Sequence, residues 1–267
     1  MKTNELSVFH HHVLELAKAR GLPFAEALAE TKEMGYDSLV TETALLNKAG
    51  DALKRLLDAN GLRIVSVYDW IDFVHDDPSA CARRTEALLR AAKDFGADNV
   101  LVLPGCFREG DDETAGLDRI CGGLSDACRR AAPLGIDVTI EDFGLPGSPN
   151  GTIAGCAAIL DRVPALRFAF DTGNFSCYGE DPHAAYERLR GRIAFVHLKD
   201  RPAGADGVDP QVEAPTGDGA LDLGRLVRRM IADGYAGAFA VEHFGHPDQE
   251  SAMRRSAAFC RRILAGS

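Results

Sequence analysis

Short runs of apolar residues alternate along the chain with longer segments in which apolar residues recur every three or four positions. The first pattern is typical of buried β-strands and the second of amphipathic α-helices. The predicted strands are residues 5–9, 36–40, 62–68, 98–103, 136–141, 166–171, 193–198 and 237–242. The predicted helices are residues 23–34, 48–59, 79–95, 113–132, 152–161, 183–189, 221–233 and 248–264. The sequence therefore predicts a strand followed by a helix, eight times in succession.

This alternation predicts the fold class. Strands that are separated by helices form a parallel sheet, because a parallel neighbour is reached only through a crossover connection. Eight such units in 267 residues fit a closed (β/α)8 TIM barrel, and no change of composition divides the chain, so we expect one domain over residues 1–267. An open doubly wound sheet is the alternative. That fold usually carries a glycine-rich phosphate-binding turn after its first strand, and none follows Phe9.

The bulk composition narrows the class of protein. The chain has 30 basic and 40 acidic residues, a net charge of −10, which argues against broad nucleic-acid binding because that needs a cationic face. The seven cysteines include no Cys-x-x-Cys pair, and we expect them to be small buried residues in a reducing compartment. The first residues are polar, and no apolar run approaches membrane-spanning length. We expect a cytoplasmic protein that binds neither nucleic acid nor membrane.

Four of the predicted strands end with a side chain of a type that binds metals. These side chains are Glu141, Asp171, His197 and Glu242. Successive side chains of a strand point to opposite faces, and in three of the four strands the bulkier apolar residues have the opposite parity to the polar group. The bulky face is expected to pack against the outer helices. We therefore predict that all four polar groups point into the barrel mouth at the C-terminal ends of strands five to eight, where barrel active sites lie.

Three carboxylates and one imidazole make a donor set that consists mostly of oxygen. Such a set suits Mn²⁺, Mg²⁺ or Co²⁺ with coordination positions left open for water or substrate, and it is less favourable for Zn²⁺. A strand-end acid taken alone more often caps the following helix or pairs with a basic neighbour. Four such residues in succession and with matching parity favour one shared metal site instead.

At these residues the chain resembles the xylose-isomerase-like family of sugar isomerases and epimerases. This family includes ketose 3-epimerases, hydroxypyruvate isomerases, inosose dehydratases and, more distantly, AP endonucleases. The resemblance rests on the order Glu141, Asp171, His197, Glu242, in which the metal ligands of the family follow one another. It implies a (β/α)8 barrel that holds one divalent ion, most often Mn²⁺, and a reaction at a carbon next to a carbonyl group.

The resemblance also implies a division of roles among the four residues. The metal would polarise the substrate carbonyl and stabilise the enediolate that forms when the α-proton leaves. Glu141 and Glu242 are then the acid/base pair, of which one removes the proton and the other returns one. Asp171 and His197 serve mainly as ligands. The alternative for either glutamate is metal ligation without proton transfer.

The chain departs from the pattern of the family at two places. Many epimerases of the family have a histidine three residues after the aspartate of strand six, where this chain has Asn174. An asparagine can form a hydrogen bond to a substrate oxygen but cannot transfer protons near neutral pH. AP endonucleases have further histidines after strands three and four, where this chain has Tyr68-Asp69 and Leu103-Pro104. This difference, together with the acidic net charge, argues against a DNA-repair nuclease.

Further residues are predicted to contact the substrate. Lys199 and Arg201 share the parity of His197, so we expect them to reach a substrate carboxylate or hydroxyl group. The alternative for both is a surface ion pair with Asp200 or Asp206.

Aromatic and histidine side chains near the strand ends are the remaining candidates for the pocket. Tyr68 and Trp70 are expected to form a pocket wall, or to be plain packing. Within the histidine run 10–12, we expect one pocket contact, assigned to His10, and two surface residues. His243 has the opposite parity to Glu242 and is predicted to be buried behind the ligands rather than to be one of them.

The longest predicted loop, residues 202–219, follows strand seven on the catalytic side. A long loop at this position is typical of a lid or a substrate selector. Its Gly217-Asp218-Gly219 turn is a poor phosphate cradle because Asp218 would repel an anion. The lack of a basic cluster favours an unphosphorylated sugar, polyol or keto acid.

The sequence thus predicts a metal-dependent isomerase or epimerase of a small ketose, inosose or hydroxy-keto acid. One alternative is a dehydratase or lyase of the inosose or dehydroshikimate kind, in which Lys199 protonates the leaving hydroxyl group. Another is a non-catalytic sugar-binding or scaffolding barrel, against which the presence of both Glu141 and Glu242 argues. The resemblance also suggests a homo-oligomer, with no indication of its size.

Overall fold

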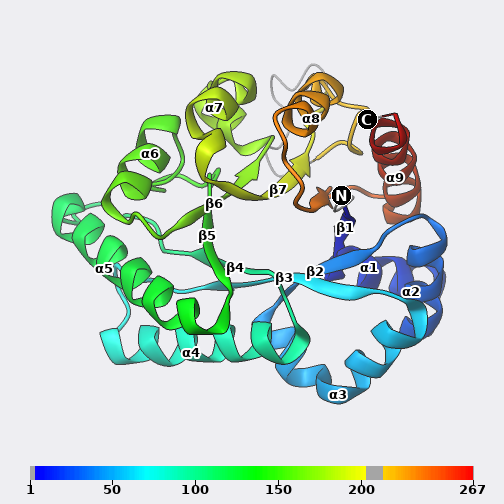
Figure 1. Ribbon diagram of the computed structural model, residues 1–267, viewed down its shortest axis with the longest axis horizontal. Helices are drawn as coiled ribbons and strands as arrows, with labels where there is room; N and C mark the ends of the chain where they lie inside the picture. The colour runs from blue at the N-terminus through cyan, green and yellow to red at the C-terminus, as the bar shows by residue number, and fades with distance from the viewer. Residues whose placement is uncertain (1–3, 203–212, 267) are drawn as a thin grey trace. The chain divides into compact units, whose positions relative to one another are not determined.

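The structure is a computed structural model that describes residues 4–202 and 213–266. Its eight strands follow one another in chain order, each hydrogen-bonded to the next, and close into a parallel barrel (Figure 1). The strands are β1 (Leu6–Phe9), β2 (Ser38–Glu42), β3 (Arg63–Trp70), β4 (Asn99–Leu103), β5 (Asp137–Glu141), β6 (Arg167–Asp171), β7 (Ile193–Lys199) and β8 (Phe239–Glu242). The predicted (β/α)8 fold class is therefore confirmed, while the extent of a single domain stays a prediction.

Nine α-helices are present in the described part of the chain. They are α1 (His10–Arg20), α2 (Phe24–Glu33), α3 (Thr43–Asn60), α4 (Pro78–Phe95), α5 (Glu113–Ala131), α6 (Ile153–Arg162), α7 (Pro182–Leu189), α8 (Leu223–Ala232) and α9 (Gln249–Ala265). Short 3₁₀ helices η1 (Ala132–Leu134), η2 (Asn174–Tyr178) and η3 (Arg190–Arg192) lie between them. The first of the α-helices was not predicted from the sequence.

The missed helix α1 begins directly where β1 ends, because Phe9 is both the last strand residue and the helix N-cap. Its first turn consists of three histidines, which weaken the apolar pattern of an amphipathic helix. The signal that does remain is the buried set Val13, Leu16 and Ala17, spaced as one helical face. Gly21, which follows the helix with φ 63°, is the left-handed residue that commonly ends such a helix.

The chain forms two compact units, each with its own part of the barrel. The first unit lies within residues 1–41, 49–65 and 196–267, and the second within residues 42–48 and 66–195. In the first unit β1 pairs in parallel with β2 and with β8, and β7 pairs with β8. In the second unit the parallel pairs are β3 with β4, β4 with β5, and β5 with β6.

Strand β6 shows how the alternation of residues in the sequence determines which side chains lie on each face of a barrel strand. Phe168 and Phe170 are fully buried, and the ring of Phe170 meets that of Tyr186 in α7 edge-on, with 6.3 Å between the centroids. The bulky aromatic face of the strand therefore packs against the outer helix. Ala169 and Asp171, which have the other parity, are left on the opposite face, as the sequence predicts.

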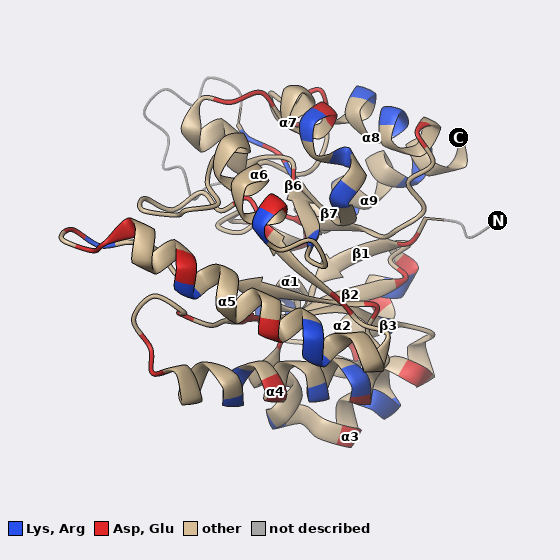
Figure 2. Cartoon of the chain, turned by 60° about the vertical axis from the view of Figure 1, so that its left-hand side comes forward, with Lys and Arg blue, Asp and Glu red and all other residues tan. Residues whose placement is uncertain are grey.

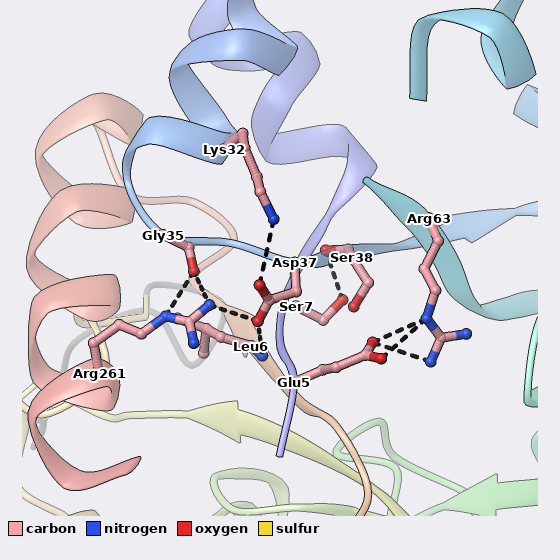
Figure 3. Close-up of polar contacts among 9 residues, drawn as sticks. All are labelled: Glu5, Leu6, Ser7, Lys32, Gly35, Asp37, Ser38, Arg63 and Arg261. Atoms are coloured by element: carbon pink, nitrogen blue, oxygen red, sulfur yellow. Dashed lines mark hydrogen bonds and ion pairs between the residues drawn. The ribbon is translucent and has the colours of Figure 1, made fainter. Parts of the chain in front are cut away.

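A polar network surrounds the N-terminal ends of β1 and β2 in the first unit (Figure 3). Asp37, just before β2, accepts a hydrogen bond from the backbone N–H of Leu6 in β1 at 3.1 Å, and its carboxylate also meets Arg261 of α9 at 2.5 Å and Lys32 of α2 at 3.4 Å. One side chain thus connects four elements. Because this network surrounds the start of β1, and the candidate ligands lie where strands end, we expect it to serve stability.

Charged residues of both signs are interspersed on the outer helices (Figure 2). On α4, Arg90 pairs with Glu86 at 2.9 Å, and on α5 Asp126 pairs with Arg130 at 2.5 Å. Within the described residues, no helix has both the length and the apolar character that crossing a membrane requires. The absence of nucleic-acid partners stays a prediction.

Candidate metal and active site

In the second unit, the ends of β5 and β6 carry two buried acidic side chains. Glu141 is 7% exposed and Asp171 is fully buried. Asp171 Oδ1 accepts hydrogen bonds from the backbone N–H groups of Gly173, at 2.7 Å, and Asn174, at 2.9 Å. These two donors orient the carboxylate and stabilise its negative charge at the strand end. Both side chains are therefore placed as the strand parity predicts.

A third acidic residue, Asp142, supports this pair and was not singled out from the sequence. Its Oδ1 accepts the backbone N–H of Asp171 at 2.9 Å, and its carbonyl accepts the Asn174 amide at 2.9 Å. Burial, together with the nearby charge of Asp171, raises the pKa of Asp142 well above its ordinary value. The position of Asp142 directly after Glu141 in the sequence was the signal that could have identified it. Asn174 was predicted to bind substrate, and that role stays a prediction.

In the first unit, β7 and β8 bring three of the predicted site residues together. His197 Nδ1 lies 3.5 Å from Glu242 Oε2, and Lys199 Nζ lies 2.7 Å from Glu242 Oε1. All three residues are at most 7% exposed. The alternative in which Lys199 forms a surface ion pair is wrong, because the strand parity that it shares with His197 turns it inward.

Lys199 has a second carboxylate partner, which could not be expected from the sequence. Glu213 Oε1 lies 3.3 Å from Lys199 Nζ, and Glu213 Oε2 accepts the backbone N–H of Phe244 at 2.7 Å. Glu213 is 5% exposed although it belongs to the connection between β7 and α8. Glu213 does not lie at the end of a strand, so it could not be found by looking for polar residues at strand ends.

The segment that carries Glu213 is folded against the end of β7. Thr216 Oγ1 donates to the Leu198 carbonyl at 2.9 Å, and the Asp200 carboxylate accepts the backbone N–H groups of Gly217 at 2.9 Å and Gly219 at 3.0 Å. A Cβ atom at Gly219 would lie 2.2 Å from Asp200 Oδ1, so this close approach requires glycine. Residues 203–212 of the predicted lid lie outside the described residues.

Glu141, Asp171 and His197 form a buried group that could hold a metal ion. Each residue offers one ligand atom, and these atoms all lie within 4.8 Å of one another. Two ligands bonded to one ion at about 2.2 Å stand at most about 4.4 Å apart, so the group is close to the size that a bound ion needs. Two carboxylates and an imidazole are acceptable to Mn²⁺, Mg²⁺, Co²⁺ and Zn²⁺. The donor set therefore fits a divalent metal.

Of the two histidines of α1 that were predicted to lie on the surface, His12 is instead buried and His11 is partly exposed, and His10 is buried as well. His10 Nδ1 lies 2.9 Å from Thr41 Oγ1, and burial lowers the pKa of His10 to about 4. The ring of His12 stacks on that of His243, with 4.0 Å between the centroids, and its Nε2 accepts the backbone N–H of His243. The predicted burial of His243 is confirmed, and the substrate contact of His10 stays a prediction.

The remaining predicted pocket residues are placed as follows. Tyr68 and Trp70 lie at the end of β3 and are partly exposed, and the ring of Trp70 is 5.7 Å from that of Phe143. Arg201 is also partly exposed, and its backbone N–H donates to Asp200 at 2.9 Å. Their contacts with substrate stay predictions.

Comparison with known proteins agrees with this architecture. Residues 15–263 match the family described as xylose isomerase-like TIM barrel. L-ribulose-5-phosphate 3-epimerase UlaE of Escherichia coli (strain K12) is 26% identical over 254 residues, which cover 90% of this chain and 84% of that protein.

Two solved structures share the fold. The probable 3-DHS dehydratase AsbF of Bacillus anthracis has a TM-score of 0.80 and 16% identity, covering 96% of this chain and 98% of that one. The IOLI protein, solved with a zinc atom, has a TM-score of 0.78 and 17% identity, covering 98% of both chains.

Proposed function

Because the chain belongs to the xylose isomerase-like TIM barrel family, we propose that it is a divalent-metal-dependent isomerase or epimerase. The proposed substrate is a small ketose, inosose or hydroxy-keto acid. The observation that carries this proposal is the buried group Glu141, Asp171 and His197, whose ligand atoms lie within 4.8 Å of one another. UlaE, named an L-ribulose-5-phosphate 3-epimerase, supports a reaction of the same class.

Four residues would hold the metal in this proposal: Glu141, Asp171, His197 and Glu242. Glu242 joins the group because its Oε2 lies 3.5 Å from His197 Nδ1. The ion is expected to be Mn²⁺, with Mg²⁺, Co²⁺ and Zn²⁺ as alternatives. When bound, it supplies Lewis-acid stabilisation of the negative charge that develops on the substrate oxygens.

The two glutamates are the proposed proton-transfer residues. In an epimerisation one carboxylate removes the proton next to the carbonyl group, and the other delivers a proton to the opposite face of the same carbon. The ammonium of Lys199, 2.7 Å from Glu242 Oε1, stabilises the negative charge that Glu242 needs to accept a proton. Asp171, oriented by two backbone N–H groups, serves as a ligand only.

A dehydratase or lyase is the second candidate, and the buried position of Lys199 favours it. Its ammonium lies directly beside a proposed acid/base residue and can donate a proton. If proton removal by a glutamate were followed by loss of a β-hydroxyl group, Lys199 could protonate the departing oxygen as water forms. This reaction would give an unsaturated product instead of an epimer.

Proton NMR in D₂O distinguishes the two reactions. The Mn²⁺-loaded protein is incubated with a panel of ketoses, inososes and keto acids, and the products are analysed. Solvent deuterium at an inverted carbon supports the epimerase, and an unsaturated or deoxy product supports the dehydratase. Glu86→Gln, an exposed residue of α4, is the matched control and should behave as the unmodified protein. A protein that binds Mn²⁺ but changes no substrate would instead be a non-catalytic sugar-binding barrel.

A further inference from the structure

Lys199 lies between two buried carboxylates. Its Nζ is 2.7 Å from Glu242 Oε1 and 3.3 Å from Glu213 Oε1, and the side chains of all three residues are at most 9% exposed. Buried charges require close partners, because each has lost its hydration. The three groups together carry a net charge of −1. The second carboxylate therefore leaves part of the negative charge of Glu242 uncompensated by the lysine.

Glu213 is held in this place by contacts that do not involve Lys199. Its Oε2 accepts the backbone N–H of Phe244 at 2.7 Å, just after β8. The backbone N–H of the next residue, Ala214, donates to the Asp200 carbonyl at 3.0 Å, just after β7. One oxygen of Glu213 is thus used for anchoring, while the other faces the ammonium. Glu213 Oε2 therefore makes a structural contact with the Phe244 N–H group, and Oε1 makes an electrostatic contact with the Lys199 ammonium.

We propose that Glu213 is a positioning residue that shares the charge of Lys199 and so keeps Glu242 available to the metal ion and the substrate proton. The inference rests on the proposed function, in which Glu242 is a ligand and an acid/base residue. Without the negative charge of Glu213, the ammonium would compensate the charge of Glu242 more fully. Lys199 would then compete with a divalent cation for that carboxylate.

If Glu213 has this role, the effect of replacing Glu213 on Mn²⁺ binding should depend on whether Lys199 is present. Glu213→Gln keeps an oxygen that can accept the Phe244 N–H group but removes the charge that faces Lys199. Lys199→Gln removes the competing cation. If Glu213 acts through Lys199, then Glu213→Gln should weaken Mn²⁺ binding in the otherwise unmodified protein and have no effect when Lys199 is already replaced.

The experiment is a double-mutant cycle read by the EPR signal of free Mn²⁺. We expect Glu213→Gln to raise the Mn²⁺ dissociation constant about 10-fold, as for other residues that orient metal ligands. Lys199→Gln should lower it, and the double variant should match Lys199→Gln within about twofold. The turnover number of Glu213→Gln should fall with little change in KM, because the substrate contacts are kept. Glu86→Gln is again the control, and Lys199→Met replaces Lys199→Gln if the latter does not fold.

Three results would overturn the inference. Unchanged Mn²⁺ affinity in Glu213→Gln would show that Glu213 only anchors the loop. An equal loss in both backgrounds would show that its charge acts on the metal directly and not through Lys199. A protein that binds no Mn²⁺ at all would overturn the proposed function together with this inference. If the protein binds Mn²⁺ but the effects of Glu213→Gln and Lys199→Gln on its affinity are additive, only this inference is overturned.

Discussion

Lys199 and Glu242 are paired directly across the neighbouring strands β7 and β8 and form a buried ion pair of 2.7 Å. The strand register itself therefore creates the contact, because cross-strand partners in a sheet face the same side. A cation held beside a candidate metal ligand needs a function or a compensating charge. Lys199 is proposed to donate a proton in the dehydratase alternative, and Glu213 is proposed to share its charge in either reaction.

Glu242→Gln tests whether this residue transfers protons. The amide keeps an oxygen that can bind a metal but cannot accept the substrate proton, so we expect the turnover number to fall about 10²–10⁴-fold. Mn²⁺ affinity should fall less. Steady-state kinetics and Mn²⁺ titration on the same preparation separate the two effects. Full turnover with intact metal binding would assign Glu242 to ligation alone.

Asp37→Ala tests the separation between stability and function. The substitution removes the acceptor for the Leu6 N–H group and the partner of Arg261, so the free energy of unfolding should fall by about 1–2 kcal/mol. Urea denaturation measures the loss. Mn²⁺ affinity and turnover of the folded variant should stay as they are, because Asp37 precedes β2 whereas the proposed ligands lie where strands end. A change in metal affinity without loss of stability would contradict this assignment.

His75 predicts a pH-dependent contribution to stability in the second unit. Its Nδ1 lies 2.9 Å from Asp72 and its Nε2 2.9 Å from Asp111, so both ring nitrogens donate only when the imidazole is protonated. The hydrogen bond to Asp72 is the main reason that the pKa of His75 is raised, while burial and, to a smaller extent, Arg108 oppose the rise. A raised pKa means that the stabilisation is complete below the ordinary value of 6.5 and is lost as pH rises through the folded-state pKa.

Melting temperatures of the unmodified protein and of His75→Asn, measured from about pH 5.5 to pH 8.5, test this expectation. The variant should be less stable at the acidic end, and the difference should shrink as pH rises. His183→Asn, in α7, is a matched control. A difference between His75→Asn and the unmodified protein that stays constant with pH would mean that protonation of His75 does not link to folding.

The strands and the direction of the four candidate ligands could be predicted because both depend on local alternation. Phe170 and Asp171 are adjacent in sequence, so packing of the ring against α7 turns the carboxylate to the other face. Helix α1 was missed because the chain enters it from β1 without a turn, so no helix was predicted over the histidine run. The expected surface position of His12 was wrong for the same reason.

Contacts between distant segments could not be predicted from local patterns. Glu213 contacts Lys199 because the connection after β7 folds back. Asp142, just after β5, accepts a hydrogen bond from the backbone N–H of Asp171 in β6. The alternative partners considered for Lys199, Asp200 and Asp206, were chosen for their closeness in sequence, whereas Glu242, with which it forms an ion pair, lies on the neighbouring strand. The roles of Arg201, Tyr68 and His10 in substrate binding, and the existence of an oligomer, stay predictions.

One divalent ion is proposed to bind Glu141, Asp171, His197 and Glu242. The most direct test is the anomalous diffraction of crystals grown with Mn²⁺, which locates manganese without reference to activity. We predict one manganese peak per chain, bonded to side-chain atoms of all four residues. Crystals with no manganese at these residues, or with manganese bound only elsewhere on the chain, would rule out this metal site.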